Sequence, residues 1–167
     1  MILYRCFAWN EPARDRETDG PLWFPQPFQG EGRHDNPGHY GCLYLSDHAL
    51  SSLVEQLARF RGQRLLPSLL RRRGLPLALA EPELDERADP VDLDDPLVLK
   101  REKLRPSRVA TRHRSTTQPQ ALQLYQRHSR AAGLKWWSVY EALWMNVTMF
   151  DRAAAQLRVR SIRVLTL

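Results

Sequence analysis

GRHDNPGHYGCLYLSDHALSSLVE, residues 32–55, contains a tight turn, a short strand pattern and the start of an amphipathic helix. Asn36, Pro37 and Gly38 predict the turn, because each favours turn backbone. Residues 41–45 predict a strand. A helix over about 48–59 is expected next, capped by Ser46 or Asp47. Its apolar residues repeat at helical spacing and predict a core-facing stripe: Leu50, Leu53, Val54, Leu57 and Ala58.

The rest of the chain alternates short strand patterns with helical ones. Strands are predicted over residues 2–8, 75–80, 134–139 and 158–167, and a helix over 118–132. Residues 10–32 predict a long loop, anchored by Trp23, Phe24 and Phe28, and the acidic residues 81–95 predict another. Interleaved short elements favour an α+β fold in a single domain spanning residues 1–167.

Composition narrows the class of protein. The chain has 167 residues and no apolar run long enough to cross a membrane. It begins without a secretory leader, so we expect a cytoplasmic location and reduced cysteines at Cys6 and Cys42. The net charge of +6 comes almost entirely from arginine, since only three lysines are present. Arginine forks suit phosphates and carboxylates, so a phosphate-bearing ligand, nucleic acid and an acidic protein partner all remain open.

Arg33, Tyr44 and Glu55 stand at even steps of eleven residues, yet each has an ordinary structural explanation. Glu55 has the spacing of an exposed i, i+4 ion pair with Arg59. Arg33 is either a solvated loop arginine or a clamp for an anion. Tyr44 fits a strand core, and Ser138 fits a strand as a small residue. Spacing alone favours the structural explanation for all four.

Other chemistries have weaker signatures. A metal site would use His34, His39 and His48 with Asp35 or Asp47, but the sequence contains neither HExxH nor CxxC. The sequence also lacks the GxSxG nucleophile elbow, so it does not support a serine hydrolase. The arginine-rich residues 101–114 could contact a nucleic-acid backbone, although the chain lacks the motifs of dedicated binders. We therefore expect no metal, and we keep a basic nucleic-acid-binding module as an alternative.

The order of several motifs carries more information than any one of them. Tyr4–Arg5 in the first strand is followed by GRHDNPG, LYLSD and ALSSLVEQLARFR, and later by GLKWWS, Asn146 and MFDRA. This order resembles the RES domain family, which is named for an arginine, a glutamate and a serine. Here these residues would be Arg33, Glu55 and Ser138. His34 and Asp35 depart from the family, which often has an aromatic and a small polar residue there.

The resemblance implies an ADP-ribosyltransferase-like α+β fold, with small split β-sheets around a cleft and flanking helices. It also implies NAD⁺ breakdown by water or inorganic phosphate, with NAD⁺ as substrate and no cofactor. The implied catalytic residues are Glu55, Arg33 and Ser138. The implied substrate contacts are Tyr44 and, from the same alignment of motifs, Arg5 and Asn146.

Family members are often bacterial toxins neutralised by a helix-turn-helix antitoxin, which implies such a partner here. It would block the cleft with an acidic group near Arg33 or Arg5, and nucleic acid would be reached only through it. Two further alternatives remain: a mono-ADP-ribosyltransferase on the same fold, and a member that only binds a partner.

Overall fold

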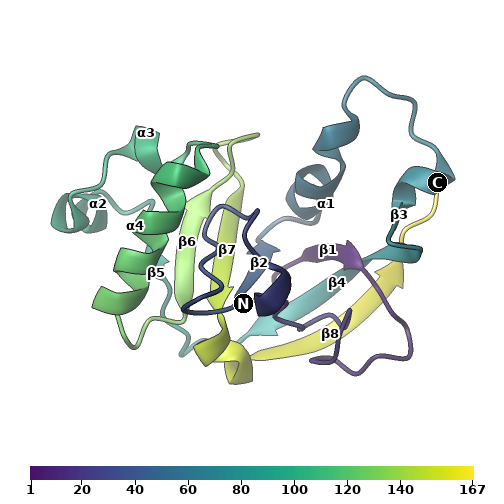
Figure 1. Cartoon of the computed structure of the whole chain (residues 1–167), viewed down its shortest axis with the longest axis horizontal. Helices are drawn as coiled ribbons and strands as arrows, with labels where there is room; N and C mark the ends of the chain where they lie inside the picture. Colours follow the sequence, from purple (N-terminus) through teal and green to yellow (C-terminus); the bar gives the residue numbers. More distant parts are fainter.

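The computed structural model describes all 167 residues and contains two four-stranded sheets (Figure 1). In the first sheet β4 pairs with each of the other three strands, all antiparallel. The second has the order β2-β7-β6-β5 and is antiparallel except for β5 against β6. The strands are β1 (Arg5–Ala8), β2 (Cys42–Ser46), β3 (Arg71–Arg72), β4 (Leu75–Leu84), β5 (Val91–Asp92), β6 (Gly133–Trp137), β7 (Met145–Phe150) and β8 (Leu157–Val164).

Helices flank both sheets. Figure 1 shows α2, α3 and α4 beside the second sheet and α1 above the strands where the two sheets meet. The helices are α1 (Ala49–Leu57), α2 (Pro96–Glu102), α3 (Pro106–Val109) and α4 (Arg114–Arg127), with 3-10 turns at η1 (Gln26–Phe28), η2 (Ala58–Phe60), η3 (Pro67–Leu70) and η4 (Asp151–Gln156). None of them is long and apolar enough to cross a membrane.

The two sheets are joined at one point. Tyr4 and Ser46 exchange two backbone hydrogen bonds, of 2.7 and 2.9 Å, so the chain just before β1 runs against the end of β2. Because side chains alternate along a strand, the second sheet presents two different faces. One face, with Leu134 and Trp136, packs under α4, and the other, with Leu43 and Val147, packs toward the N-terminal strand.

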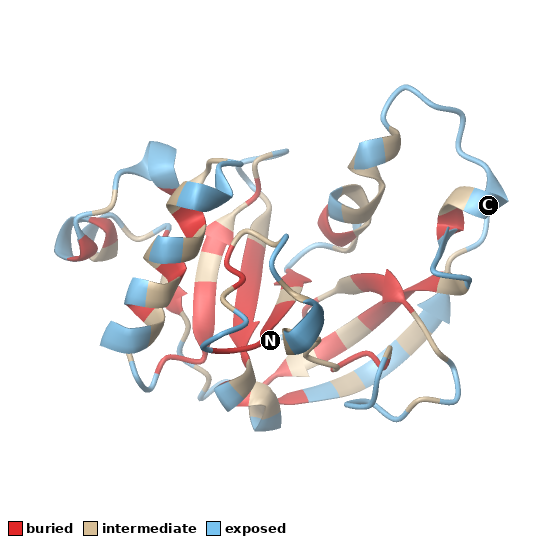
Figure 2. Cartoon of the chain, in the orientation of Figure 1, coloured by how far each residue is buried: buried red, intermediate tan, exposed pale blue.

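Burial follows this arrangement. Figure 2 shows buried residues along the central strands and on the inner side of the helices, with exposed residues on the outer side. The α+β class, with two small sheets and flanking helices, is confirmed. That the chain forms one domain stays a prediction. Cys6 and Cys42 are both buried and unpaired, as expected.

Several local predictions are wrong. The helix after β2 is capped by His48, whose Nδ1 accepts from the Leu50 amide at 3.2 Å. Its buried residues are Ser51 and Ser52, while Leu50 of the expected stripe is 50% exposed. Leu53 and Leu57 of the stripe do pack, partly buried, against Cys6, Ala8, Leu77 and Leu79 of the first sheet. Ser51 is buried beside Asn146 of β7. Phe28, an expected anchor, is 77% exposed.

Other differences concern element ends. Strand β4 continues four residues into the segment predicted as an acidic loop, because β8 pairs with it as far as Leu84. Helix α4 begins at Arg114, four residues early. Strand β7 lies within residues 140–157, where the sequence predicted no element, and it is the central partner of both β2 and β6.

Candidate active site

A cleft of about 610 Å³ opens where α1 and the second sheet face the loop before β2. Tyr44 and Ser46 of β2, Trp136 of β6 and Asn146 of β7 form its floor. The strand register explains this grouping, since Ser46, Asn146 and Trp136 pair side by side across the three strands. The walls come from α1 and from the segments around it: Phe28, Gln29, Glu31, Gly32, Arg33, Asp35, Thr111, Arg112, Arg114, Val139 and Tyr140.

Glu55 of α1 lies against this floor with one oxygen held in place. Its Oε1 accepts from the Ser138 hydroxyl at 3.0 Å and from the Asn146 amide at 3.3 Å. Asn146 is itself fixed, because its Oδ1 accepts from Ser46 at 2.6 Å and from Ser51 at 3.3 Å. The second carboxylate oxygen of Glu55 accepts no hydrogen bond from the protein. The carboxylate is therefore oriented and still free to act on a ligand.

The two serines on the buried face of α1 allow this contact. Ser51 and Ser52 are 0% and 6% exposed, and their small side chains let α1 approach β7 closely. Ser51 donates to the Asn146 side chain, and Ser52 donates to the Ala49 carbonyl of its own helix at 3.0 Å. Small side chains at these two positions leave space on the helix face. Strand β7 lies in this space, which places Asn146 next to Glu55.

Arg33 is anchored along one side of its guanidinium. Nη1 donates to the Val109 carbonyl at 2.8 Å and to the Thr111 carbonyl. The group also stacks over the Trp136 ring, 4.4 Å from the centroid. Burial lowers the pKa of Arg33, and the nearby Glu55 carboxylate partly opposes that shift. Nη2 and Nε have no protein partner, so the free edge of the fork can bind an anion.

Arg5 lies apart from these residues. Its Nη1 donates to the carbonyls of Gly20 at 3.1 Å and Pro21 at 2.6 Å, which holds the long loop against β1. Burial lowers its pKa to about 10, while the Asp19 carboxylate raises it. Arg5 lines a smaller neighbouring cavity that shares Cys6 and Tyr44 with the cleft. Of the six residues expected at the site, Arg33, Tyr44, Glu55 and Asn146 line the cleft, and Ser138 reaches it through Glu55.

The cleft is strongly basic. Its arginines come from four segments of the chain: Arg33, Arg59, Arg72, Arg112 and Arg114. Arg112 lies over the Tyr140 ring at 4.9 Å, and Arg114 pairs with Glu31 across the opening. The arginine-rich residues 101–114 are thus divided, because Arg112 and Arg114 line the cleft while Arg101 pairs with Glu102 elsewhere. This charge favours a ligand that carries phosphate groups.

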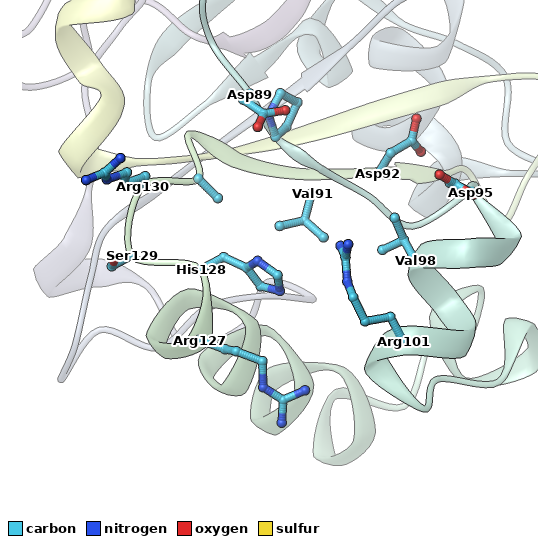
Figure 3. Close-up of a pocket in the computed structure, with 12 residues that line it drawn as sticks. Asp89, Val91, Asp92, Asp95, Val98, Arg101, Arg127, His128, Ser129 and Arg130 are labelled. Atoms are coloured by element: carbon cyan, nitrogen blue, oxygen red, sulfur yellow. The ribbon is translucent and has the colours of Figure 1, made fainter.

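A second cavity, of about 500 Å³, lies beyond the C-terminal end of α4. Figure 3 shows His128 and Arg101 reaching into it, with Asp89, Asp92 and Asp95 around the rim. Several of its charged groups are paired with residues just outside the cavity. Asp92 accepts from Lys135 at 2.8 Å, and the buried Glu102 accepts from Arg127 at 2.6 Å and contacts His128 at 3.0 Å. Asp95 caps α2 by accepting from the Leu97 amide at 2.8 Å, and no carboxylate of this cavity is held by two side-chain donors as Glu55 is.

Two of the three histidines considered as metal ligands, His34 and His48, serve other purposes. His34 is buried, with Nδ1 2.8 Å from the Thr148 hydroxyl, and His48 caps α1 and stacks on Trp144. The structure contains no group of three His, Cys, Asp or Glu side chains that could hold a metal ion.

Sequence reasoning missed two residues of this site. Trp136 was expected only as a strand residue, yet its ring supports Arg33. Asp35 was considered only as a metal ligand, yet it binds the hydroxyl of Tyr44 at 2.6 Å. The alternation of the GLKWW strand could have placed Trp136 on the cleft face. No local pattern could have paired Asp35 with Tyr44.

Comparison with known proteins settles the family. The family model described as RES domain matches residues 2–167. The chain belongs to the RES domain family. A chain of the crystal structure of the M. tuberculosis MbcT–MbcA toxin–antitoxin complex has a similar fold, with a TM-score of 0.68 and 19% identity over 99% of this chain and 84% of that one. No curated protein matches the sequence.

Proposed function

We propose that this RES domain chain degrades NAD⁺ by cleaving the bond between nicotinamide and ribose. The observation that carries the proposal is the Glu55 carboxylate, fixed on one oxygen by Ser138 and Asn146 inside an arginine-lined cleft. NAD⁺ combines a pyrophosphate, which suits the arginines, with a ribose carbon that becomes electron-poor as nicotinamide leaves. One oriented carboxylate and a basic surface match those two requirements.

The bond cleavage needs no general acid. The electron pair of the broken C1′–N bond returns to the ring nitrogen, so nicotinamide leaves as a neutral molecule. An oxygen of water or of inorganic phosphate then forms the new bond to C1′, and a water nucleophile loses one proton to solvent or to Glu55. The carboxylate stabilises the positive charge that develops on the ribose, and such electrostatic stabilisation is often the largest catalytic contribution. Glycosidases with poorer leaving groups need a second carboxylate to protonate them.

The remaining residues bind and orient the substrate in this proposal. The free edge of Arg33 holds a phosphate, and the exposed part of the Tyr44 ring packs against nicotinamide. Ser138 and Asn146 orient Glu55, with Asn146 also within reach of ligand atoms on the cleft floor. Arg5 contacts the substrate only if NAD⁺ extends into the neighbouring cavity.

We also propose that the chain is the toxin of a toxin–antitoxin pair. Support comes from the family and from the similar fold in a solved toxin–antitoxin complex. The neutralising partner would be a helix-turn-helix antitoxin that places an acidic group against the free edge of Arg33. To test this contact, the partner is co-expressed with the double variant Arg33→Glu/Arg5→Glu, and binding is measured by pull-down. Unchanged binding would contradict the charge-based docking.

Incubating the purified chain with NAD⁺, with and without inorganic phosphate, tests the activity directly. Nicotinamide release is expected from the wild type and is expected to fall at least about 100-fold in Glu55→Gln. Glu86→Gln, at an exposed position remote from the cleft, is the matched control. A ribosyl-phosphate product that needs phosphate identifies a phosphorylase, and free ADP-ribose identifies a glycohydrolase. ADP-ribose attached to protein would instead identify a mono-ADP-ribosyltransferase.

A further inference from the structure

Asp35 is a buried carboxylate at the edge of the cleft, 6% exposed, with three donors around it. Its Oδ1 accepts from the Tyr44 hydroxyl at 2.6 Å. Its Oδ2 accepts from the backbone amides of Gly30 at 2.9 Å and Gly32 at 2.7 Å. The side chain therefore ties the floor of the cleft, at Tyr44, to the loop that forms the wall beside Arg33.

The hydroxyl of Tyr44 is fully used by the protein. It donates to Asp35 and accepts from the His34 amide at 2.9 Å. Burial, followed by the nearby Cys42 and Asp35, raises the pKa of Tyr44 well above its ordinary value. Tyr44 thus stays a neutral phenol whose hydroxyl is turned into the protein. What it can offer a ligand is the ring, and the two hydrogen bonds fix the tilt of that ring.

Only a carboxylate satisfies this position completely. An asparagine side chain has one acceptor oxygen, so it would present its NH₂ group either to the two glycine amides or to the Tyr44 hydroxyl. Donor would then face donor at the glycines, or the hydroxyl proton of Tyr44 would lose its acceptor. Because Asp35 is buried, such a mismatch cannot be relieved by water without movement of the loop.

We propose that Asp35 is a positioning residue, which holds the Tyr44 ring and the loop of residues 30–32 in the arrangement that binds the nicotinamide end of NAD⁺. This inference rests on the proposed function. Asp35 acts through Tyr44 and does not itself touch the reacting atoms. It therefore governs substrate binding more than the rate of bond cleavage.

Steady-state kinetics of nicotinamide release test this with the wild type, Asp35→Asn, Tyr44→Phe and the double variant. Asp35→Asn is expected to raise KM about tenfold, because a misplaced binding surface costs about 1.4 kcal/mol of affinity, while kcat changes less than about threefold. Tyr44→Phe keeps the ring but frees it from Asp35, so it also raises KM. The double variant is expected to be no worse than Asp35→Asn, since both remove the same link.

Asp151→Asn is the matched control. Asp151 also accepts two backbone amides, of Gly41 at 2.9 Å and Arg152 at 2.8 Å, but it does not line the cleft. Its replacement is expected to lower thermal stability and leave KM unchanged.

Three outcomes distinguish failure of the positioning role of Asp35 from failure of the proposed function. A wild-type KM in Asp35→Asn, or additive effects in the double variant, would overturn the positioning role while leaving the proposed function intact. If Asp35→Asn does not fold, a wild-type KM in Tyr44→Phe overturns it in the same way. A folded wild type that releases no nicotinamide would instead reject the proposed function.

Discussion

Ser138 donates its hydroxyl to Glu55 across a distance of 3.0 Å, although 83 residues separate them in the sequence. Ser138 follows β6 and is only 2% exposed, whereas Glu55 lies on the cleft side of α1. The serine also accepts from the Tyr140 amide at 3.1 Å, which fixes the direction of its own proton. The serine of the family name therefore orients the glutamate in this structure.

Replacing Ser138 by alanine should therefore impair catalysis without disturbing the fold. Hydrogen bonds to charged groups contribute about 1.5–3 kcal/mol, which corresponds to a fall in kcat/KM of about 10-fold to 100-fold. Nicotinamide release and thermal unfolding are measured on the same sample. Ser161→Ala, at an exposed position of β8, is the control. An unchanged kcat/KM in Ser138→Ala would show that Asn146 alone orients Glu55.

Arg33→Lys keeps the charge but removes the planar fork. A lysine cannot donate to both the Val109 and Thr111 carbonyls, stack on Trp136 and present a second edge to a phosphate. We expect a stability loss of about 1–3 kcal/mol and a KM raised at least about tenfold. Urea unfolding and NAD⁺ kinetics check the two effects. Arg64→Lys, on the exposed loop after η2, should change neither.

Features set by neighbouring residues could be predicted from the sequence. The strand that carries Tyr44 and the helix that carries Glu55 follow from local patterns of alternation and helical spacing. The family motifs then indicated Arg33 and Ser138 as partners.

Contacts between distant segments could not be predicted in this way. Arg33 donates to carbonyls more than seventy residues away, and no local pattern specifies that contact. The buried face of α1 was predicted only in part, for a related reason. Leu53 and Leu57 of the predicted stripe pack against the first sheet, but the most buried residues of the helix are Ser51 and Ser52. Ser51 lies opposite Asn146, a contact that hydrophobic spacing does not specify.

His34 should make stability depend on pH below neutrality. The buried Nδ1 of His34 lies 2.8 Å from Thr148 Oγ1, which also accepts from Trp136 at 3.0 Å, so neutral His34 has a hydrogen-bond partner in the core. Burial, and then the Arg33 charge, lowers the pKa of His34 well below its ordinary 6.5. Below about pH 6.5 the unfolded chain therefore binds a proton that the folded chain does not bind. The free energy of unfolding accordingly decreases as the pH falls below that value.

The slope of the free energy of unfolding against pH tests whether His34 is the residue responsible. One such proton changes the free energy of unfolding by up to about 1.4 kcal/mol per pH unit below pH 6.5. Urea unfolding of wild type and His34→Gln at several pH values between 7 and 5 measures it. The variant is less stable at pH 7 but should show the shallower slope. Equal slopes would mean that the folded protein accommodates a charged His34.

Arg152 should stabilise the fold without affecting the cleft. It donates to the carbonyls of Ala131 at 2.9 Å, Tyr125 at 3.2 Å and His128 at 2.9 Å, and it lies 4.1 Å from the Tyr125 ring centroid. Arg152→Met keeps the volume but leaves these carbonyls at the end of α4 without a donor, at an expected cost of about 2–4 kcal/mol. Urea unfolding measures the loss, and Arg130→Met is the exposed control. A changed KM in the folded variant would contradict the separation from the cleft.

Gly32 and Gly38 give a matched pair of tests on the same loop. A Cβ atom at Gly32 would lie 2.5 Å from both Asp35 Oδ1 and the Tyr44 hydroxyl oxygen, whereas one at Gly38 would have no atom within 4 Å. Neither glycine has the positive φ that excludes other residues. Gly32→Ala should therefore separate Asp35 from Tyr44, costing about 1–3 kcal/mol of stability and raising KM. Gly38→Ala should be neutral or stabilise by up to about 1 kcal/mol, because it restricts only the unfolded chain. Equal effects of the two alanines on thermal unfolding and KM would show that the loop moves freely enough to absorb the clash, and the Asp35–Tyr44 contact would then not define the cleft.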